Sequence, residues 1–305
     1  MPNFLIVGAA KAGTTSLYSY LKQHPQIYMS PVKETNFFAF EGAELNFLGG
    51  ISQGYLADFK TNIDDYRAQF QGVNNEIAIG EASPSYLYLP KAVARIKYYI
   101  PEVKIIVILR NPIERAYSHF LHHLRDRLVD YRDFEQALDA EAQAIADNWW
   151  WDYHYIQVGL YYQQLKRYFA NFKQEQIKVW LYEDLTSNPL ALIQDICQFL
   201  GVERQFAPDM AARLNATGVP RYRTLDALIK EPNLIKTVYQ LLPAKLRQPI
   251  TAQINQRNPL KKPPLLPHIR QHLLGLYRED ILQLQQLIQR DLSGWLQELN
   301  LAASN

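Results

Sequence analysis

Residues 8–16, GAAKAGTTS, place a lysine, two glycines and three hydroxyl side chains on one short stretch after an apolar run. Gly8 and Gly13 have the spacing of the glycines in a nucleotide phosphate loop, where small residues let backbone N–H groups approach an anion. Lys11 adds a positive charge. The hydroxyl donors at the start of the following helix are Thr14, Thr15 and Ser16. Together these residues predict a binding site for phosphate or a similar anion.

The position of the lysine separates this loop from that of an ATP-binding kinase. In the kinase loop the lysine directly follows the second glycine, reaches the β- and γ-phosphates, and has a neighbour that holds magnesium. Here Thr14 occupies that place, and the apolar run IIVIL ends in Arg110, where an ATPase carries a metal-binding aspartate. The pattern predicts an anion site without a metal. A P-loop nucleotide or small-molecule kinase, dependent on ATP and magnesium, stays open as the alternative.

Two stretches resemble the signatures of sulfotransferases that use 3'-phosphoadenosine 5'-phosphosulfate (PAPS). GAAKAGTTSLYSYL is similar to the loop that holds the 5'-phosphosulfate, and VKIIVILRNPIERAYSHF is similar to the 3'-phosphate signature. The resemblance implies that Arg110, after the strand, and Ser118, on the next helix, hold the 3'-phosphate. It implies 3'-phosphoadenosine 5'-phosphate (PAP) as the product. The residues it assigns to the 5'-phosphosulfate are Lys11, Ala12, Gly13, Thr14, Thr15 and Ser16.

Further segments extend the resemblance over most of residues 4–202. SPVKETNFF and GEASPSYL are similar to two stretches of glycan-type sulfotransferases, a group that includes the heparan sulfate enzymes. By this resemblance Glu34 is the general base that removes a proton from an acceptor hydroxyl or amine. Lys11 is expected to stabilise the negative charge that develops on the leaving phosphate during in-line transfer.

One position departs from the glycan-type pattern. Where those enzymes carry a second lysine in the segment similar to GEASPSYL, this chain has Ala82. Either Lys33 supplies the missing charge, or the acceptor and the layout of the site differ. The acceptors left open are a saccharide or glycolipid, a small molecule, and a 3-hydroxyacyl chain on an acyl-carrier protein. The last is the acceptor of bacterial sulfotransferase domains in polyketide-type assembly lines, which this chain also resembles.

Histidines are the alternative to Glu34 as the base, because some sulfotransferases use one. The candidates are His119, His122, His123 and His154. Histidines four positions apart share a helix face and could also bind a metal. No second acidic or cysteine cluster in the sequence supports a metal site, so we expect none.

A segment at about 203–268 is rich in proline and basic residues, and we expect loops and short helices that cover one side of the protein. Within it, NATGVPRYR is expected from its order along the chain to close over the adenosine and 3'-phosphate. Its candidate contacts are Arg221 and Arg223. With this covering segment, residues 1–305 are expected to form a single sulfotransferase domain.

These residues need a scaffold that brings distant loops together. Apolar runs such as FLIVGAA and VKIIVILRNP alternate with helical patterns such as AVARIKYYI. That order predicts an α/β fold with a central parallel β-sheet flanked by helices, the three-layer fold of P-loop proteins. Polar clusters at 8–16, 81–86 and 110–118 each follow a predicted strand. We expect them to converge, because ligands of such sheets bind at the carboxyl ends of the strands.

Composition limits the class of protein. The balance of 32 basic and 30 acidic residues argues against a nucleic-acid-binding protein. The single cysteine, Cys197, allows no internal disulfide and suits a reducing compartment. No apolar run reaches the roughly 18 to 20 residues of a membrane span, and the N-terminus lacks the pattern of a secretory signal. We therefore expect a cytoplasmic bacterial enzyme or a domain cut from a larger protein.

Overall fold

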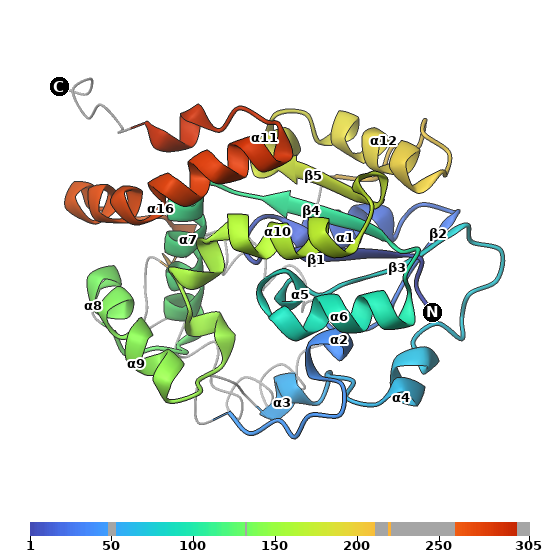
Figure 1. Cartoon of the computed structure of the whole chain (residues 1–305), viewed down its shortest axis with the longest axis horizontal. Helices are drawn as coiled ribbons and strands as arrows, with labels where there is room; N and C mark the ends of the chain where they lie inside the picture. The colour runs from blue at the N-terminus through green and yellow to red at the C-terminus, as the bar shows by residue number, and fades with distance from the viewer. Residues whose placement is uncertain (48–52, 132, 211–218, 221–259, 298–305) are drawn as a thin grey trace, which may run out of the picture.

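The chain folds around a five-stranded parallel β-sheet with helices on both faces, which confirms the predicted α/β fold (Figure 1). The structure is a computed structural model, and it describes residues 1–47, 53–131, 133–210, 219–220 and 260–297. The strand order is β2-β3-β1-β4-β5. The strands are β1 (Phe4–Gly8), β2 (Ile27–Met29), β3 (Ala78–Ala82), β4 (Lys104–Leu109) and β5 (Ile177–Leu181).

Helices connect the strands and form the outer layers. Those before β4 are α1 (Thr14–Leu21), α2 (Phe37–Phe40), α3 (Gln53–Leu56), α4 (Ile63–Ala68), α5 (Ser85–Tyr88) and α6 (Pro90–Tyr99). Those after it are α7 (Pro112–Asp126), α8 (Phe134–Asp139), α9 (Glu141–Ala146), α10 (Tyr161–Asn171), α11 (Tyr182–Ser187), α12 (Pro189–Leu200) and α16 (Pro267–Ile288). The 3-10 helices are η1 (Trp151–Tyr153), η2 (Gln157–Gly159), η3 (Gln174–Gln176) and η4 (Ser293–Leu296). A separate antiparallel pair joins β6 (Val219–Pro220) and β7 (Leu260–Lys261).

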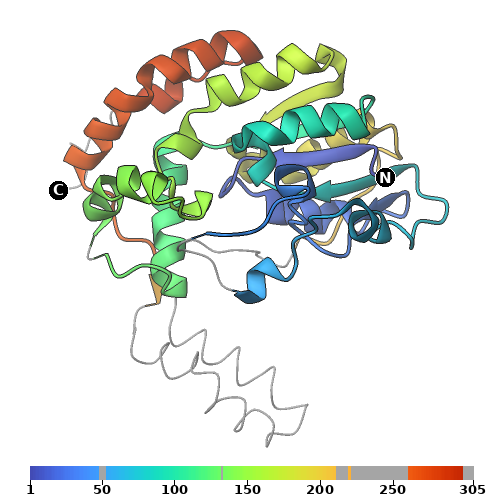
Figure 2. The same cartoon turned by 60° about the horizontal axis from the view of Figure 1, so that its bottom comes forward.

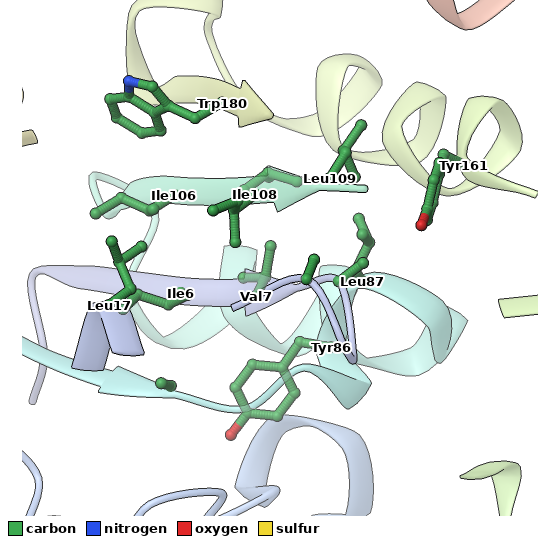
Figure 3. Close-up of a cluster of buried hydrophobic side chains, with 14 of the residues drawn as sticks. Ile6, Val7, Leu17, Tyr86, Leu87, Ile106, Ile108, Leu109, Tyr161 and Trp180 are labelled. Carbon is green, nitrogen blue, oxygen red and sulfur yellow. The ribbon is translucent and has the colours of Figure 1, made fainter. Parts of the chain in front are cut away.

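β1 and β4 lie side by side in the interior of the sheet. Every residue of β1 is buried, and so is every residue of β4 after Lys104. Continuous apolar strands are typical of parallel sheets that are covered on both faces. Figure 3 shows the side chains of Val7 and Ile108 in one cluster with Leu87 of α5. This packing fixes the carboxyl ends of β1 and β4, where the predicted anion-binding loops begin.

The outer layers follow the amphipathic patterns of the sequence. In Figure 1, α6 and α10 lie in front of the sheet and α1 lies behind it. The long C-terminal helix α16 runs beside α10 in both views (Figures 1 and 2). Its buried face is formed by Ile269, Leu273, Leu274, Tyr277, Ile281 and Leu284. Among the described residues, no helix has both the length and the apolar composition needed to cross a bilayer.

Local signals fix the start of α7, which carries part of the candidate site. The Asn111 side chain accepts hydrogen bonds from the backbone N–H groups of Ile113 (3.0 Å) and Glu114 (3.3 Å). Pro112 occupies the first turn, where its missing N–H costs no hydrogen bond. These signals start the helix at Pro112, so Arg110 lies just outside the cap.

Two parts of the fold go beyond the predictions. The short helices α2, α3, α4, α8 and α9 were not predicted. The covering segment predicted at about 203–268 lies largely outside the described residues, so its helices and loops stay a prediction. Residues 262–263 near its end contact α7: Lys262 pairs with Glu114, and Tyr117 donates to the Pro263 carbonyl (3.1 Å).

Candidate active site

A pocket of about 530 Å³ lies at the carboxyl ends of β1 and β4. Its lining comes from the loop after β1, the loop after β2, helix α7, the segment at 150–152 and the start of α11. The strand order reverses beside β1, with β3 on one side and β4 on the other. Open α/β sheets bind ligands at such a reversal. The pocket is therefore where this fold is expected to hold its ligands.

The pocket brings together predicted residues from three separate stretches of sequence. Those that line it are Lys11, Gly13, Thr14, Thr15, Ser16, Glu34, Arg110 and Ser118. Ala12 does not line it, because it is fully buried and its N–H donates to the Ala9 carbonyl (3.3 Å). Arg221 and Arg223 lie outside the described residues, so their contact with a 3'-phosphate stays a prediction. Of the cluster at 81–86, Pro84 reaches the pocket, and the polar side chains turn inward.

The glycine at the start of α1 is required by its surroundings. Gly13 has a φ of 98°, a left-handed conformation that disfavours other residues. A Cβ atom there would lie 2.6 Å from Cδ2 of Leu185 on α11. The close approach of α11 to the loop therefore depends on Gly13, and it brings Tyr182 into the pocket wall.

Lys11 carries its charge in a poorly solvated place. Burial lowers the pKa of Lys11 to about 8, and the carboxylates of Asp152 and Glu34 act in the opposite direction. Its backbone has a φ of 63°, and its carbonyl accepts a hydrogen bond from Nη1 of Arg110 (3.0 Å). Arg110 is thus linked by a hydrogen bond to the backbone of the loop that carries Lys11.

Arg110 is held in place on two sides. Its guanidinium carbon lies 4.6 Å from the centre of the Tyr182 ring, within range of a cation–π interaction. Its backbone carbonyl accepts a hydrogen bond from the Tyr161 hydroxyl (2.9 Å). Ser118 lies on α7 and is buried at the pocket wall. A planar guanidinium fixed in this way is suited to gripping an anion through several N–H groups.

Glu34 faces the same pocket from the loop after β2. Its side chain is 24% exposed, pairs with Lys33, and accepts a hydrogen bond from the Tyr55 hydroxyl. Burial raises the pKa of Glu34, but Lys33 and the hydrogen bonds outweigh it, so the pKa lies below its usual value. Glu34 is therefore ionised at neutral pH and able to accept a proton. Lys33 also lines the pocket and supplies a cation beside Glu34.

Two predicted histidines belong to a hydrogen-bonded network around Asp152, which the sequence did not single out. His119 and His123 each place Nε2 on a separate oxygen of Asp152, at 2.7 and 3.0 Å. Nη1 of Arg115 lies 3.1 Å from Nδ1 of His119. Arginine offers only donors, so Nδ1 must accept and Nε2 must carry the proton that it donates to Asp152.

This tautomer determines whether His119 is able to bind a metal or accept a proton. The donor atoms of His119, His123 and Asp152 lie within 4.8 Å of one another, a spacing that a metal ion could use. A protonated Nε2 on His119 ligates no metal and accepts no proton. Burial lowers the pKa of His119 to about 3, so the ring is neutral. Burial alone would raise the pKa of Asp152, yet the imidazole hydrogen bonds hold it well below its usual value.

Of the histidines considered as the general base, His122 is therefore the remaining candidate. It lines the pocket, and burial lowers its pKa to about 4, which leaves the ring neutral. Its Nδ1 lies 2.6 Å from Nη2 of Arg125 and 3.3 Å from Oδ2 of Asp126. Arginine offers only donors, so here too Nδ1 accepts and Nε2 carries the proton, and His122 would accept a proton at Nε2 only after Nδ1 turned to donate to Asp126. His154 contacts the Tyr88 hydroxyl through Nδ1 (2.8 Å) and does not line the pocket.

Several pocket residues were missed by sequence reasoning. Tyr55, Asp152 and Tyr182 line the pocket, each from a different segment. Asp152 had one available signal, since it is an acidic residue within the aromatic stretch NWWWDYHY. Of those tryptophans, Trp150 and Trp151 line the pocket but are almost fully buried, and they pack among other aromatic rings. Their side chains form an apolar part of the pocket wall.

Comparisons with known proteins agree with this geometry. The chain is 34% identical to a solved sulfotransferase from Alicyclobacillus acidocaldarius, with a TM-score of 0.76, over 97% of this chain and 99% of the other. It is 28% identical to carbohydrate sulfotransferase 15 of Mus musculus over 74% of this chain and 49% of that protein. It is 25% identical to bifunctional heparan sulfate N-deacetylase/N-sulfotransferase 4 of Mus musculus over 98% of this chain and 31% of that protein.

The chain thus spans about a third to a half of the length of these two curated relatives. The family model for the sulfotransferase domain matches residues 1–215, which include the loop after β1, Glu34, and the stretch from Arg110 to Ser118. On this match, and on the parallel sheet with a pocket at the carboxyl ends of β1 and β4, the chain belongs to the sulfotransferase domain family.

Proposed function

We propose that this protein transfers the sulfuryl group of PAPS to an acceptor hydroxyl or amine. The observation that carries the proposal is the meeting of Lys11, Glu34 and Arg110 in one pocket. A general base and a group that stabilises a leaving anion are what such a transfer requires. Sulfotransferases as a family use PAPS, and this chain belongs to that family.

The pocket residues suit the anionic groups of PAPS. Lys11 offers a charge, and the loop from Gly13 to Ser16 offers N–H and hydroxyl donors at the N-terminus of α1, where the helix dipole favours an anion. Arg110 and Ser118 are proposed to hold the 3'-phosphate. When bound, PAPS would supply the sulfuryl group and a phosphate that leaves as part of PAP.

The proton and charge movements are assigned to two side chains. Glu34, ionised and hydrogen-bonded to Tyr55, accepts the proton of the acceptor hydroxyl or amine. Lys11, as an ammonium, stabilises the charge that develops on the leaving phosphate oxygen. Trp150 and Trp151, which are almost fully buried, form an apolar part of the pocket wall beside these groups.

The acceptor is proposed at the level of class. The curated relatives include a carbohydrate sulfotransferase and a heparan sulfate N-sulfotransferase, which favours a saccharide or glycolipid. A 3-hydroxyacyl chain on an acyl-carrier protein is the second candidate, because Ala82 departs from the glycan-type pattern and part of the pocket wall is aromatic. Lys33 beside Glu34 is proposed to take over the role of the missing lysine.

Calorimetric titration of the full chain with PAP tests the proposal, with ATP plus magnesium and adenosine 5'-phosphosulfate as the comparisons. We expect PAP to bind at least about tenfold more tightly than either, since only PAP places a 3'-phosphate at Arg110. In the Arg110→Ala variant this preference should be lost. Preferred binding of ATP with magnesium would overturn the proposal in favour of a P-loop kinase.

A further inference from the structure

A buried carboxylate with four hydroxyl donors lies beneath the Glu34 loop. Glu81, on β3, is fully buried and does not line the pocket. One oxygen accepts hydrogen bonds from Thr35 (2.7 Å) and Ser83 (3.0 Å). The other accepts from Tyr86 (2.6 Å) and Tyr66 (3.1 Å). These four partners are neutral, so hydroxyl groups take the place of a cation around this carboxylate.

Two of these donors connect Glu81 to the loop that carries Glu34. Thr35 is the residue directly after Glu34, and its hydroxyl donates a hydrogen bond to Glu81. Ser83 donates to Glu81 and accepts the backbone N–H of Asn36 (3.2 Å). The hydrogen bonds of Glu81 therefore reach the residues on the C-terminal side of Glu34 through two separate contacts.

The loop has a backbone conformation that its own residues disfavour. Glu34 has a φ of 65° and Asn36 a φ of 54°, in the left-handed region that residues with a Cβ rarely adopt. Such conformations persist only where the surrounding structure enforces them. Here the Glu34 N–H donates to the Ala82 carbonyl (3.0 Å), and Glu81 fixes the next residue.

We propose that Glu81 is a positioning residue for Glu34: its buried carboxylate holds Thr35 and Ser83, and through them the strained loop that presents Glu34 to the pocket. The functional meaning of this inference rests on the proposed role of Glu34 as the base. A carboxylate is needed because it accepts at all its lone pairs, whereas the amide of glutamine would turn a donor toward one pair of hydroxyls. Burial raises the pKa of Glu81, and the four hydroxyls offset part of that rise.

Three variants separate the positioning of the loop from general stability. Glu81→Gln turns an amide donor toward one pair of these hydroxyls, and Thr35→Val removes the hydrogen bond from the loop to Glu81. Tyr66→Phe is the matched control, because it removes one hydrogen bond to the same carboxylate from α4, while its ring stays stacked on Phe37 at 4.3 Å. Hydrogen exchange of peptides that cover residues 33–36, measured by mass spectrometry, reports on the loop without any acceptor.

We expect exchange in residues 33–36 to accelerate by about tenfold or more in Glu81→Gln and Thr35→Val and to stay within about twofold in Tyr66→Phe. Equal acceleration in Thr35→Val and Tyr66→Phe, or none in Thr35→Val, would overturn the inference. Because Thr35→Val conserves shape, a failure of Glu81→Gln to fold leaves the comparison intact.

A carbon-13 NMR titration of the Glu34 carboxyl, assigned from its loss in Glu34→Gln, gives a second readout. In wild type the pKa of Glu34 should lie below its usual value, and in Thr35→Val it should rise as contact with Lys33 and Tyr55 weakens. An unchanged titration in that variant would contradict the positioning role. Failure of PAP to bind the wild type would instead count against the proposed function, and the loop measurements would stand apart from it.

Discussion

At Lys11, burial and the need for a positive charge oppose each other. Because burial lowers the pKa of Lys11 to about 8, the ammonium form predominates below that pH and is lost above it. PAP is an anion, so its affinity for the wild type should fall as the pH rises past about 8, by about tenfold per lost charge contact. Calorimetry from about pH 6 to about pH 10 measures this dependence.

The control for this prediction is another lysine of the same region. Lys11→Met should bind PAP more weakly, with a flat profile across this range. Lys22→Met, which changes an exposed residue at the end of α1, should keep the wild-type profile. If the affinity of Lys11→Met still falls near pH 8, another group is responsible for the titration.

Glu34 is the proposed base and His122 is the histidine alternative, and substitution distinguishes them. Glu34→Gln keeps the shape of the side chain and removes its proton acceptor, so turnover should fall by about 10²- to 10⁴-fold. PAP affinity should change by less than about twofold, since Glu34 is proposed to contact the acceptor rather than PAP. His122→Gln, measured with the same acceptor and PAPS, should retain most of the activity. The reverse outcome would make His122 the base.

At the scale of elements, α11 acts as a support for Arg110. The Tyr182 ring at the start of this helix lies against the guanidinium, and such a contact is worth about 0.5–2 kcal/mol. Tyr182→Leu should therefore weaken PAP binding by about two- to thirtyfold, whereas Tyr182→Phe, which keeps the ring, should stay close to wild type. Titration of both variants with PAP compares them directly. A loss in Tyr182→Phe as large as that in Tyr182→Leu would assign the effect to the hydroxyl.

The elements that the sequence predicted are those with continuous apolar or periodic patterns. β1, β4 and α7 were placed well because their residues are buried in regular fashion and their ends carry Gly, Asn or Pro. The helices α2 and α3 span four residues each, too few for a period to emerge. They matter nonetheless, since α3 brings Tyr55 to Glu34.

The site was predictable where one segment carries the chemistry. The loop at 8–16 and the stretch from Arg110 to Ser118 each hold several binding residues in one run of sequence. Asp152 was not predicted because its role depends on His119 and His123, which lie about one helical turn apart on another element. The cluster at 81–86 was expected at the ligand, yet Glu81 found hydroxyl partners inside the protein. Whether a side chain near a strand end points into the pocket or into the core depends on its hydrogen-bond partners, which the sequence does not reveal.

The whole molecule depends on close contact between β1 and β3. Gly80 of β3 pairs with Phe4 of β1, and a Cβ atom on Gly80 would lie 2.1 Å from Cζ of the Phe4 ring. Gly80→Ala should therefore destabilise the fold by about 1–3 kcal/mol, the usual cost of overpacking a core. Denaturant unfolding followed by tryptophan fluorescence measures this loss.

A second substitution tests the cause. Phe4→Leu opens space beside Gly80, so the double variant Gly80→Ala/Phe4→Leu should lose less stability than the sum of the two single changes. PAP affinity should stay near wild type in the folded variants, because neither residue lines the pocket. Additive losses would show that the two side chains do not compete for the same space.

The order of the strands also has a consequence for how such a protein diversifies. Lys11 and Arg110 follow β1 and β4, whereas Glu34 follows β2 and is held by the end of β3. The residues proposed to bind the sulfuryl donor and the proposed base are thus carried by different halves of the sheet. Exchange of the β2–β3 half between relatives should therefore change the surroundings of the proposed base and leave the proposed donor site intact.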